Sequence, residues 1–200
     1  YVDSPKVLSW IIFIVIASML FEIFRNSKSP FLNVAFTSLG MIWIGLLIGW
    51  SVINIESIGG FEVTLSMFLS IWTCDTFAFF FGKTLGNKKI LPAISPNKTW
   101  VGSIAGLGGS FLCMFIFYYG HNYGLPVELP GYLELNDILV LSLIYGFFGQ
   151  LGDFSESAFK RDIGVKDSGD LLRGHGGILD RFDSLTFAAP LALIYLQGIA

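Results

Sequence analysis

The sequence predicts an all-α, polytopic membrane protein. Of its 200 residues, 54% are hydrophobic and only 14% are charged, whereas a soluble domain carries about 25% charged residues. Six apolar stretches approach or exceed the roughly 20 residues that a membrane-spanning helix needs. We expect a helix for each, because helix is the only single-segment structure that satisfies its own backbone hydrogen bonds in lipid. They are expected to form one membrane-embedded domain over residues 1–200.

The six predicted helices are rich in Leu, Ile and Phe, with small residues interspersed. In chain order they cover residues 7–24, 31–50, 63–82, 100–120, 137–152 and 184–200. The fifth is short unless its neighbours extend it, and the sixth reaches the end of the chain. The fourth contains glycines that would let another helix approach closely, namely Gly102, Gly106, Gly108 and Gly109. The chain begins with Tyr1 rather than Met, so we expect that an N-terminal piece is missing.

The basic residues gather on one side of the predicted membrane domain. If the six helices alternate in direction, the connectors 25–30, 83–99 and 153–183 share a side and carry 11 of the 12 Lys and Arg residues. The opposite side keeps Lys6, beside several acidic residues. Cytoplasmic loops of membrane proteins carry an excess of Lys and Arg. The basic side is therefore predicted to face the cytoplasm, where nucleotides are.

A dense block of charged residues and glycine occupies residues 157–183, after the fifth helix. Such a block in an apolar chain favours chemistry on a charged substrate. Asp153 and Asp180 are each expected at a helix end at the cytoplasmic boundary, well placed to share a divalent cation. Carboxylates and phosphate oxygens are the natural ligands of Mg²⁺. For Glu156 we prefer a structural interpretation, a solvated ion pair with Lys160 on an exposed helix.

The segment GHGG at 174–177 is too rich in glycine for a helix. A loop there would bring backbone N–H groups and His175 close to a bound anion. Asp183 lies three residues after Asp180, so the two carboxylates are expected on adjoining faces at the start of the sixth helix.

A carboxylate lies deep in the third apolar run. Asp75 would cost roughly 2.5–3.5 kcal/mol there on membrane-insertion scales. It is therefore expected to face a polar cavity that opens to the cytoplasm and toward lipid, with Lys83 and Lys98 at its mouth. The alternative is a buried Asp paired with Lys for packing alone.

The segment SPNKTW at 95–100 has the pattern of a helix start. Ser95 would be the N-cap and Pro96 the first helical residue. The free N–H groups of that helix would lie beside Lys98 and favour phosphate. The same pattern also fits a capped helix entry that Trp100 anchors at the membrane interface, and the spacing alone does not separate the two interpretations.

Together these residues resemble the signature of the CDP-diacylglycerol synthase (phosphatidate cytidylyltransferase) family. The long motif comprises Ser157, Phe159, Lys160, Arg161, Lys166, Asp167, Gly169, Leu172, His175, Gly176, Gly177, Ile178, Asp180, Arg181, Phe182 and Asp183. Upstream, Asp75, Gly82, Lys83 and residues 95–100 are similar to further family motifs, in the expected order. The resemblance spans roughly residues 70–190, and it implies further membrane helices before Tyr1. Arg173 departs from it, because Pro or a small residue is expected at that position.

The resemblance implies a reaction in which CTP and phosphatidate give CDP-diacylglycerol and pyrophosphate. It also implies Mg²⁺ with a potassium ion (K⁺) beside it, whereas the residues alone argue only for a divalent ion. The expected catalytic residues are Asp153, Asp180, Lys160, Arg161 and His175, of which Asp153 and Asp180 hold the metal. The expected substrate-binding residues are Asp75, Lys83, Ser95, Asn97, Lys98, Lys166, Asp167, Arg181 and Asp183.

The expected partners are CTP, phosphatidate and the lipid bilayer, with no nucleic acid, and a homodimer is left open. The expected location is the plasma membrane of a bacterium, with the active site facing the cytoplasm. One alternative is a related enzyme for another lipid, such as an isoprenoid-ether phosphatidate, or a polyprenol kinase. A transporter or channel is a second alternative, but only Asp75 lies deep in the membrane. A structural scaffold would not explain the carboxylates and the glycine loop together.

Overall fold

The computed structural model describes residues 4–25, 27–169 and 177–200. Throughout these ranges the regular structure is helical and no strand forms, which confirms the predicted all-α membrane class. Among the described residues, four helical stretches are long and apolar enough to cross a membrane: Lys6–Arg25, Pro30–Leu85, Trp100–Tyr123 and Leu135–Asp162.

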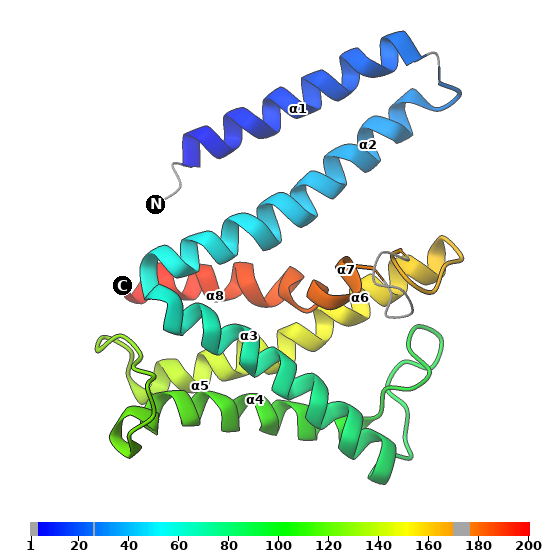
Figure 1. Ribbon diagram of the computed structural model, residues 1–200. Helices are drawn as coiled ribbons and strands as arrows, with labels where there is room; N and C mark the ends of the chain where they lie inside the picture. The colour runs from blue at the N-terminus through cyan, green and yellow to red at the C-terminus, as the bar shows by residue number, and fades with distance from the viewer. Residues whose placement is uncertain (1–3, 26, 170–176) are drawn as a thin grey trace.

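The N-terminal half consists of one separate helix and one long bent helix (Figure 1). Helix α1 (Ser4–Arg25) packs along α2 (Pro30–Gly40), which continues through the π-helical stretch η1 (Met41–Trp50) into α3 (Ser51–Leu85). Gly60 has φ 77°, a left-handed value that side chains with a Cβ rarely adopt. The chain bends at this glycine and so forms two arms, which contain the predicted helices 31–50 and 63–82.

The C-terminal half contains the other predicted helices. They are α4 (Trp100–Gly120) with the 3₁₀ turn η2 (His121–Tyr123), then α5 (Leu135–Leu143), the π-helical η3 (Ile144–Phe148), α6 (Gly149–Asp162), α7 (Leu179–Phe182) and α8 (Leu185–Ile199). Helices α5, η3 and α6 follow without a break, so the short fifth segment is extended ten residues beyond its predicted end. Helix α8, at 15 residues, is shorter than the four spanning stretches.

The buried core lies between α3, α4, α5–η3 and α8. Met67 of α3, Met114 of α4, Leu141 of α5 and Leu193 of α8 all contribute to it, with almost no exposed surface. Helices α1 and α2 contribute nothing to this cluster among the described residues, and they lie above it in Figure 1. The core therefore holds α3, which carries Asp75, against α4, which Lys98 precedes, and against α5–η3, which continues into the α6 helix of Asp153.

Glycines bring α4 directly against the backbone of α3, as predicted. A Cβ on Gly102 would lie 2.6 Å from the Ala78 carbonyl oxygen, and one on Gly106 would lie 2.8 Å from that of Cys74. Gly109 is similarly crowded by the Phe77 side chain, at 2.9 Å. Gly108 is different, because a Cβ there would meet nothing within 4 Å. Close contact between α3 and α4 thus fixes the distance between polar residues on their facing ends.

The predicted helix start at Ser95 and Pro96 is wrong, because α4 begins at Trp100 with Thr99 as its N-cap. The Thr99 hydroxyl accepts a hydrogen bond from the Gly102 N–H at 3.2 Å. The backbone of residues 88–90 pairs with that of residues 98–100, through Ile90 N to Lys98 O and Trp100 N to Lys88 O. This pairing draws the chain at Lys98 and Thr99 into an extended conformation, so a helix cannot run on from Ser95.

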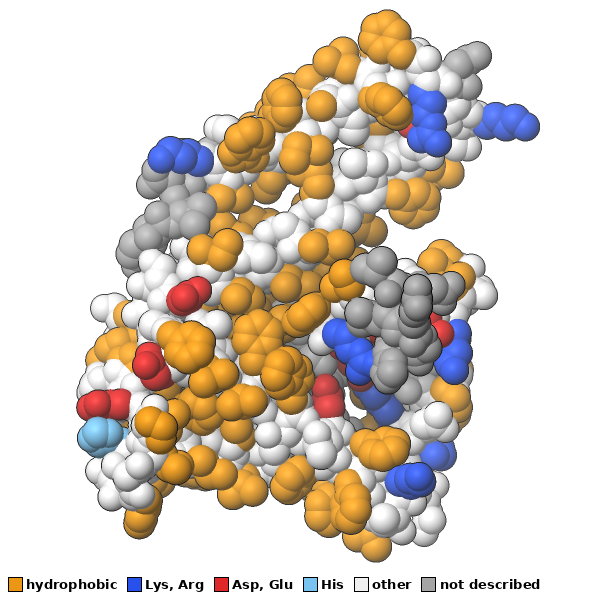
Figure 2. Space-filling model, viewed as in Figure 1, with side chains coloured by type: hydrophobic (Ala, Val, Ile, Leu, Met, Phe, Trp, Pro, Cys, Tyr) orange, Lys and Arg blue, Asp and Glu red, His pale blue; other side chains and the backbone are white. Residues whose placement is uncertain are grey.

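The connectors 27–29, 86–99 and 163–169 lie at the same, right-hand end of the helices in Figure 1. Most Lys and Arg side chains visible in Figure 2 lie at that end, together with some acidic ones, whereas the lower left-hand edge shows acidic side chains and no Lys or Arg. The helical arrangement thus gathers most basic residues at one end of the helices, as the alternating segments predicted.

Candidate active site

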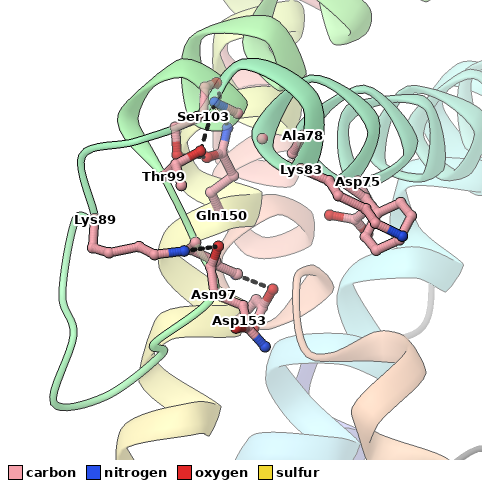
Figure 3. Close-up of a pocket in the computed structure, with 14 residues that line it drawn as sticks. Asp75, Ala78, Lys83, Lys89, Asn97, Thr99, Ser103, Gln150 and Asp153 are labelled. Carbon is pink, nitrogen blue, oxygen red and sulfur yellow. Dashed lines mark hydrogen bonds and ion pairs between the residues drawn. The ribbon is translucent and has the colours of Figure 1, made fainter.

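A cavity of about 570 Å³ lies between α3, α4, α6 and the loop 86–99 (Figure 3). This volume is within the range of small-molecule sites. Its charged and amide lining includes five residues that the sequence predicted for the site: Asp75, Lys83, Asn97, Lys98 and Asp153. The cavity expected around Asp75 is therefore present, and the described residues contain no ion pair between Asp75 and a lysine.

Lys98 and Asp153 form an ion pair across the cavity. Lys98 lies just before α4, and its Nζ is also 4.4 Å from the centre of the Phe154 ring. Asp153 is on α6, and its second carboxylate oxygen accepts a bond from Ser157 Oγ at 3.4 Å. Both charged side chains are about one quarter exposed, at 28% and 23%. A ligand entering the cavity would therefore meet both charges.

Two further lysines line the cavity. Lys83 Nζ lies 5.6 Å from the centre of the Phe79 ring, and Lys89 Nζ donates to the Asn97 carbonyl oxygen at 3.4 Å. Within the described residues, neither lysine has a carboxylate partner. These two cations are thus available to an anionic ligand.

A second charged cluster lies further along α6. Lys160 Nζ is 2.5 Å from Glu156 Oε2 and 2.5 Å from Asp180 Oδ1. Glu156 is only 1% exposed, so the predicted solvated ion pair on an exposed helix is wrong. The reason lies one turn earlier, where a Cβ on Gly152 would be 2.6 Å from the Asp183 carbonyl oxygen. That glycine brings α6 against the start of α8, and the contact buries Glu156.

Asp180 is surrounded by hydrogen-bond donors. Its Oδ2 accepts bonds from Ser168 N at 2.9 Å, Ser168 Oγ at 2.7 Å and Gly177 N at 2.6 Å, while Oδ1 accepts the bond from Lys160. Burial alone would raise the pKa of Asp180, but these bonds outweigh burial and hold the pKa well below its usual range. Asp180 therefore stays ionised and ties residues 168 and 177 to α6.

Asp183 is in the opposite electrostatic situation. Burial raises the pKa of its carboxyl group from 3.8 to about 8, and the Asp153 and Glu156 carboxylates add to the rise. A hydrogen bond from Ser184 N at 2.6 Å opposes the rise without cancelling it. Asp183 thus lies among an excess of carboxyl groups, and its own ionisation there is unfavourable.

This excess of carboxylate fits a divalent cation, although the described residues contain no cluster of three His, Cys, Asp or Glu side chains that could hold a metal. Mg²⁺ is usually held by one or two carboxylates together with substrate phosphates and water. Asp153 and Asp183 fit that requirement. Asp180 fits it less well, because both of its oxygens already accept bonds within the protein.

The other predicted residues lie outside the cavity lining. Ser95 is in the loop, where its carbonyl oxygen accepts a bond from Lys98 N at 3.4 Å. Arg161 donates to the Ile94 carbonyl oxygen at 3.4 Å and so joins α6 to the same loop. Lys166, Asp167 and Arg181 are exposed. His175 and Arg173 lie outside the described residues.

Sequence reasoning missed four polar residues that line the cavity: Lys89, Thr99, Ser103 and Gln150. Lys89 was counted only as one of the basic residues on its side of the membrane. Gln150 carried a usable signal, since an amide within an apolar run needs a polar partner. The sequence did not indicate which helix would supply that partner.

Comparison with known proteins identifies relatives of the chain. Residues 4–199 match the family described as Cytidylyltransferase family. The phosphatidate cytidylyltransferase of Staphylococcus haemolyticus is 39% identical over 176 residues, which are 88% of this chain and 64% of that protein. Those of Staphylococcus aureus strain COL and Staphylococcus saprophyticus are 40% and 37% identical, over 88% and 90% of this chain and 64% and 65% of each relative. The chain thus spans slightly less than two thirds of these relatives.

Proposed function

We propose that this chain, which belongs to the cytidylyltransferase family, transfers the cytidylyl group of CTP to phosphatidate. The observation that carries the proposal is the cavity in which Lys83, Lys89 and Lys98 converge with Asp153. It offers cations to phosphates at one end of apolar helices, where a lipid headgroup and a nucleotide can meet. The names of the relatives support the same activity. The acyl chains of the lipid could then remain in the bilayer throughout.

The obstacle in this reaction is repulsion between two anions. The phosphate oxygen of phosphatidate would attack the α-phosphorus of CTP, the bond from that phosphorus to the β-phosphate oxygen would break, and pyrophosphate would leave. The attacking phosphate is already a nucleophile, so the site needs positioning and charge neutralisation more than a strong base. Lys83 and Lys89 would bind phosphates, since a lysine is a common point-binder of phosphate. Lys98, once released from Asp153, would neutralise charge near the reacting phosphorus.

We propose Mg²⁺ as the cofactor, with Asp153 as one ligand. Asp183 is the better placed second ligand, and Asp180 could serve only by giving up hydrogen bonds that it now accepts. The ion would lower the repulsion between the phosphates and stabilise the leaving pyrophosphate. The K⁺ ion that the family resemblance implies stays a prediction.

We place the site at the cytoplasmic face of a bacterial plasma membrane. The basic connectors at one end of the helices support this orientation. CTP would then reach the cavity from the cytoplasm, and phosphatidate from the adjacent leaflet.

Pyrophosphate release by the purified protein in detergent tests the proposal. Release should require CTP, phosphatidate and Mg²⁺ together, and Asp153→Asn should abolish it while the thermal unfolding temperature (Tm) stays close to that of the unchanged chain. Polyprenol in place of phosphatidate tests the kinase alternative, because a kinase would yield CDP and no pyrophosphate. Failure to release pyrophosphate with any phosphatidate, including an isoprenoid-ether form, would count against the proposed reaction.

A further inference from the structure

We propose that Gln150 and Ser103 form a neutral link between α6 and α4 that keeps the site assembled while the Lys98–Asp153 pair is open. The inference rests on the proposed function, because it takes the phosphate and the metal of that reaction as the ligands that separate the pair. Gln150 is then a positioning residue, since it acts through Lys98 and Asp153 and not on the substrate.

The link is reciprocal. Ser103 Oγ donates to Gln150 Oε1 at 2.5 Å, and Gln150 Nε2 donates back to the Ser103 carbonyl oxygen at 3.1 Å. The same Nε2 also donates to the Gly146 carbonyl oxygen at 2.9 Å and lies 3.5 Å from Cys74 Sγ on α3. Three helices thus meet at one side-chain amide, whose donor and acceptor atoms are all in use.

The neutral link lies one helical turn from the ion pair. Ser103 N donates to the Thr99 carbonyl oxygen at 2.9 Å, so Ser103 is in the first turn of α4, which begins two residues after Lys98. Asp153 follows Gln150 by three residues, which places both on one face of α6. Two links therefore join the same pair of helices at successive turns, one neutral and one ionic, and both line the cavity (Figure 3).

Ligand binding would break only the ionic link, the Lys98–Asp153 pair. Lys98 would turn to a phosphate and Asp153 to a metal, so the pair could no longer hold α4 against α6. A neutral amide competes poorly for phosphate, and the Gln150 amide is already satisfied. The Gln150–Ser103 link would therefore persist and keep Lys98 and Asp153 facing each other across the bound ligand.

The decisive variant is Gln150→Leu, with Ser110→Ala as its matched control. Ser110 Oγ donates to the Ser142 carbonyl oxygen at 3.0 Å, so it also joins α4 to the continuous helix α5–η3–α6, but about two turns away from the link. In the pyrophosphate assay, Gln150→Leu should raise the KM for CTP and the Mg²⁺ requirement about five- to tenfold, the loss expected for one or two neutral hydrogen bonds.

Thermal unfolding separates positioning from general stability. Without ligand, Gln150→Leu should change Tm little, because the ion pair still joins the helices. The rise in Tm on adding Mg²⁺ and CTP should shrink clearly, and Ser110→Ala should alter neither the KM values nor that rise. An equal loss of Tm with and without ligand, at unchanged KM values, would overturn the proposal and leave Gln150 a packing residue.

If the unchanged chain releases no pyrophosphate, the proposed function fails. Thermal unfolding without ligand then still tests the link, because it does not depend on activity. The link is then judged from Gln150→Leu, Lys98→Met and the double variant, all without ligand. Each single variant leaves one link intact, so the double variant should lose more Tm than the sum of the two single losses. Additive losses would overturn the link whatever the enzyme does.

Discussion

The charged residues of the site are unevenly matched. Lys98 pairs with Asp153, and Lys160 is shared by Glu156 and Asp180. Within the described residues, by contrast, the hydrogen bonds that Asp183 accepts come from the backbone N–H and the hydroxyl of Ser184. The same site therefore contains one carboxyl group with a strongly lowered pKa, in Asp180, and another with a raised pKa, in Asp183. This difference gives the protein without ligand a measurable dependence on pH.

The stability of the ligand-free protein should fall as pH rises from about 4 to about 8. The pKa of Asp183 is about 8 in the folded protein and near 3.8 when unfolded, so in this range the folded state keeps a proton that the unfolded state has released, and rising pH favours unfolding. Asp183→Asn should flatten this dependence. Thermal unfolding in detergent with a chelator, at several pH values from 5 to 8, measures it. Equal slopes for the two proteins would contradict the placement of Asp183 among carboxylates.

Removing the shared lysine should expose the cost of the buried Glu156. Lys160→Met leaves two carboxylates without their cation, and breaking a buried pair costs roughly 3–5 kcal/mol. The free energy of unfolding should fall by about that amount, whereas Lys166→Met, at an exposed position, should leave it nearly unchanged. Chemical denaturation in detergent measures both. Adding Glu156→Gln to Lys160→Met should recover part of the lost free energy of unfolding. If Lys160→Met alone lowers that free energy only slightly, Glu156 is solvated after all.

At the scale of elements, helix positions were predictable and helix ends were not. Apolar length alone located the segments around 7–24 and 100–120, because lipid leaves helix as the only option. The predicted start of α4 was wrong, because its cap depends on backbone pairing between residues 88–90 and 98–100 that no local pattern reveals. The prediction that Glu156 is solvated was wrong for a related reason. Its burial depends on the contact between Gly152 and Asp183, which lies 31 residues further along the chain.

The close packing of α4 against α3 can be tested with two glycines of α4. Gly106→Ala would place a Cβ 2.8 Å from the Cys74 carbonyl oxygen and force the helices apart, which typically costs 1–3 kcal/mol. Gly108→Ala meets nothing within 4 Å and should be neutral or slightly stabilising, because Ala favours helix. Thermal unfolding should rank Gly106→Ala well below Gly108→Ala, and similar values for both would contradict the close packing.

At the scale of the whole molecule, the candidate site depends on three segments far apart in the sequence. Asp75, Lys98 and Asp153 were each noticed from local patterns, a carboxylate in an apolar run or a lysine near a helix start. Their convergence on one cavity follows from helix packing. Gln150 and Lys89 were missed because an isolated amide or one more surface lysine has no distinctive spacing. The basic end of the molecule was predictable, since charge counting needs only the order of the segments.

The orientation of the whole molecule can be tested across α4 alone. Lys88 and Tyr123 are exposed residues on the connectors before and after this helix, so they should lie on opposite sides of the membrane. The two native cysteines, Cys74 and Cys113, are free and buried, and replacing both by Ala gives a background for single cysteines. In intact cells, a membrane-impermeant thiol reagent should label Tyr123→Cys. It should label Lys88→Cys only after the cytoplasmic face is opened, because we propose that the basic end faces the cytoplasm. The reverse pattern would invert the orientation and move the cavity away from cytoplasmic CTP, and labelling of both positions from one side would show that α4 does not cross the bilayer.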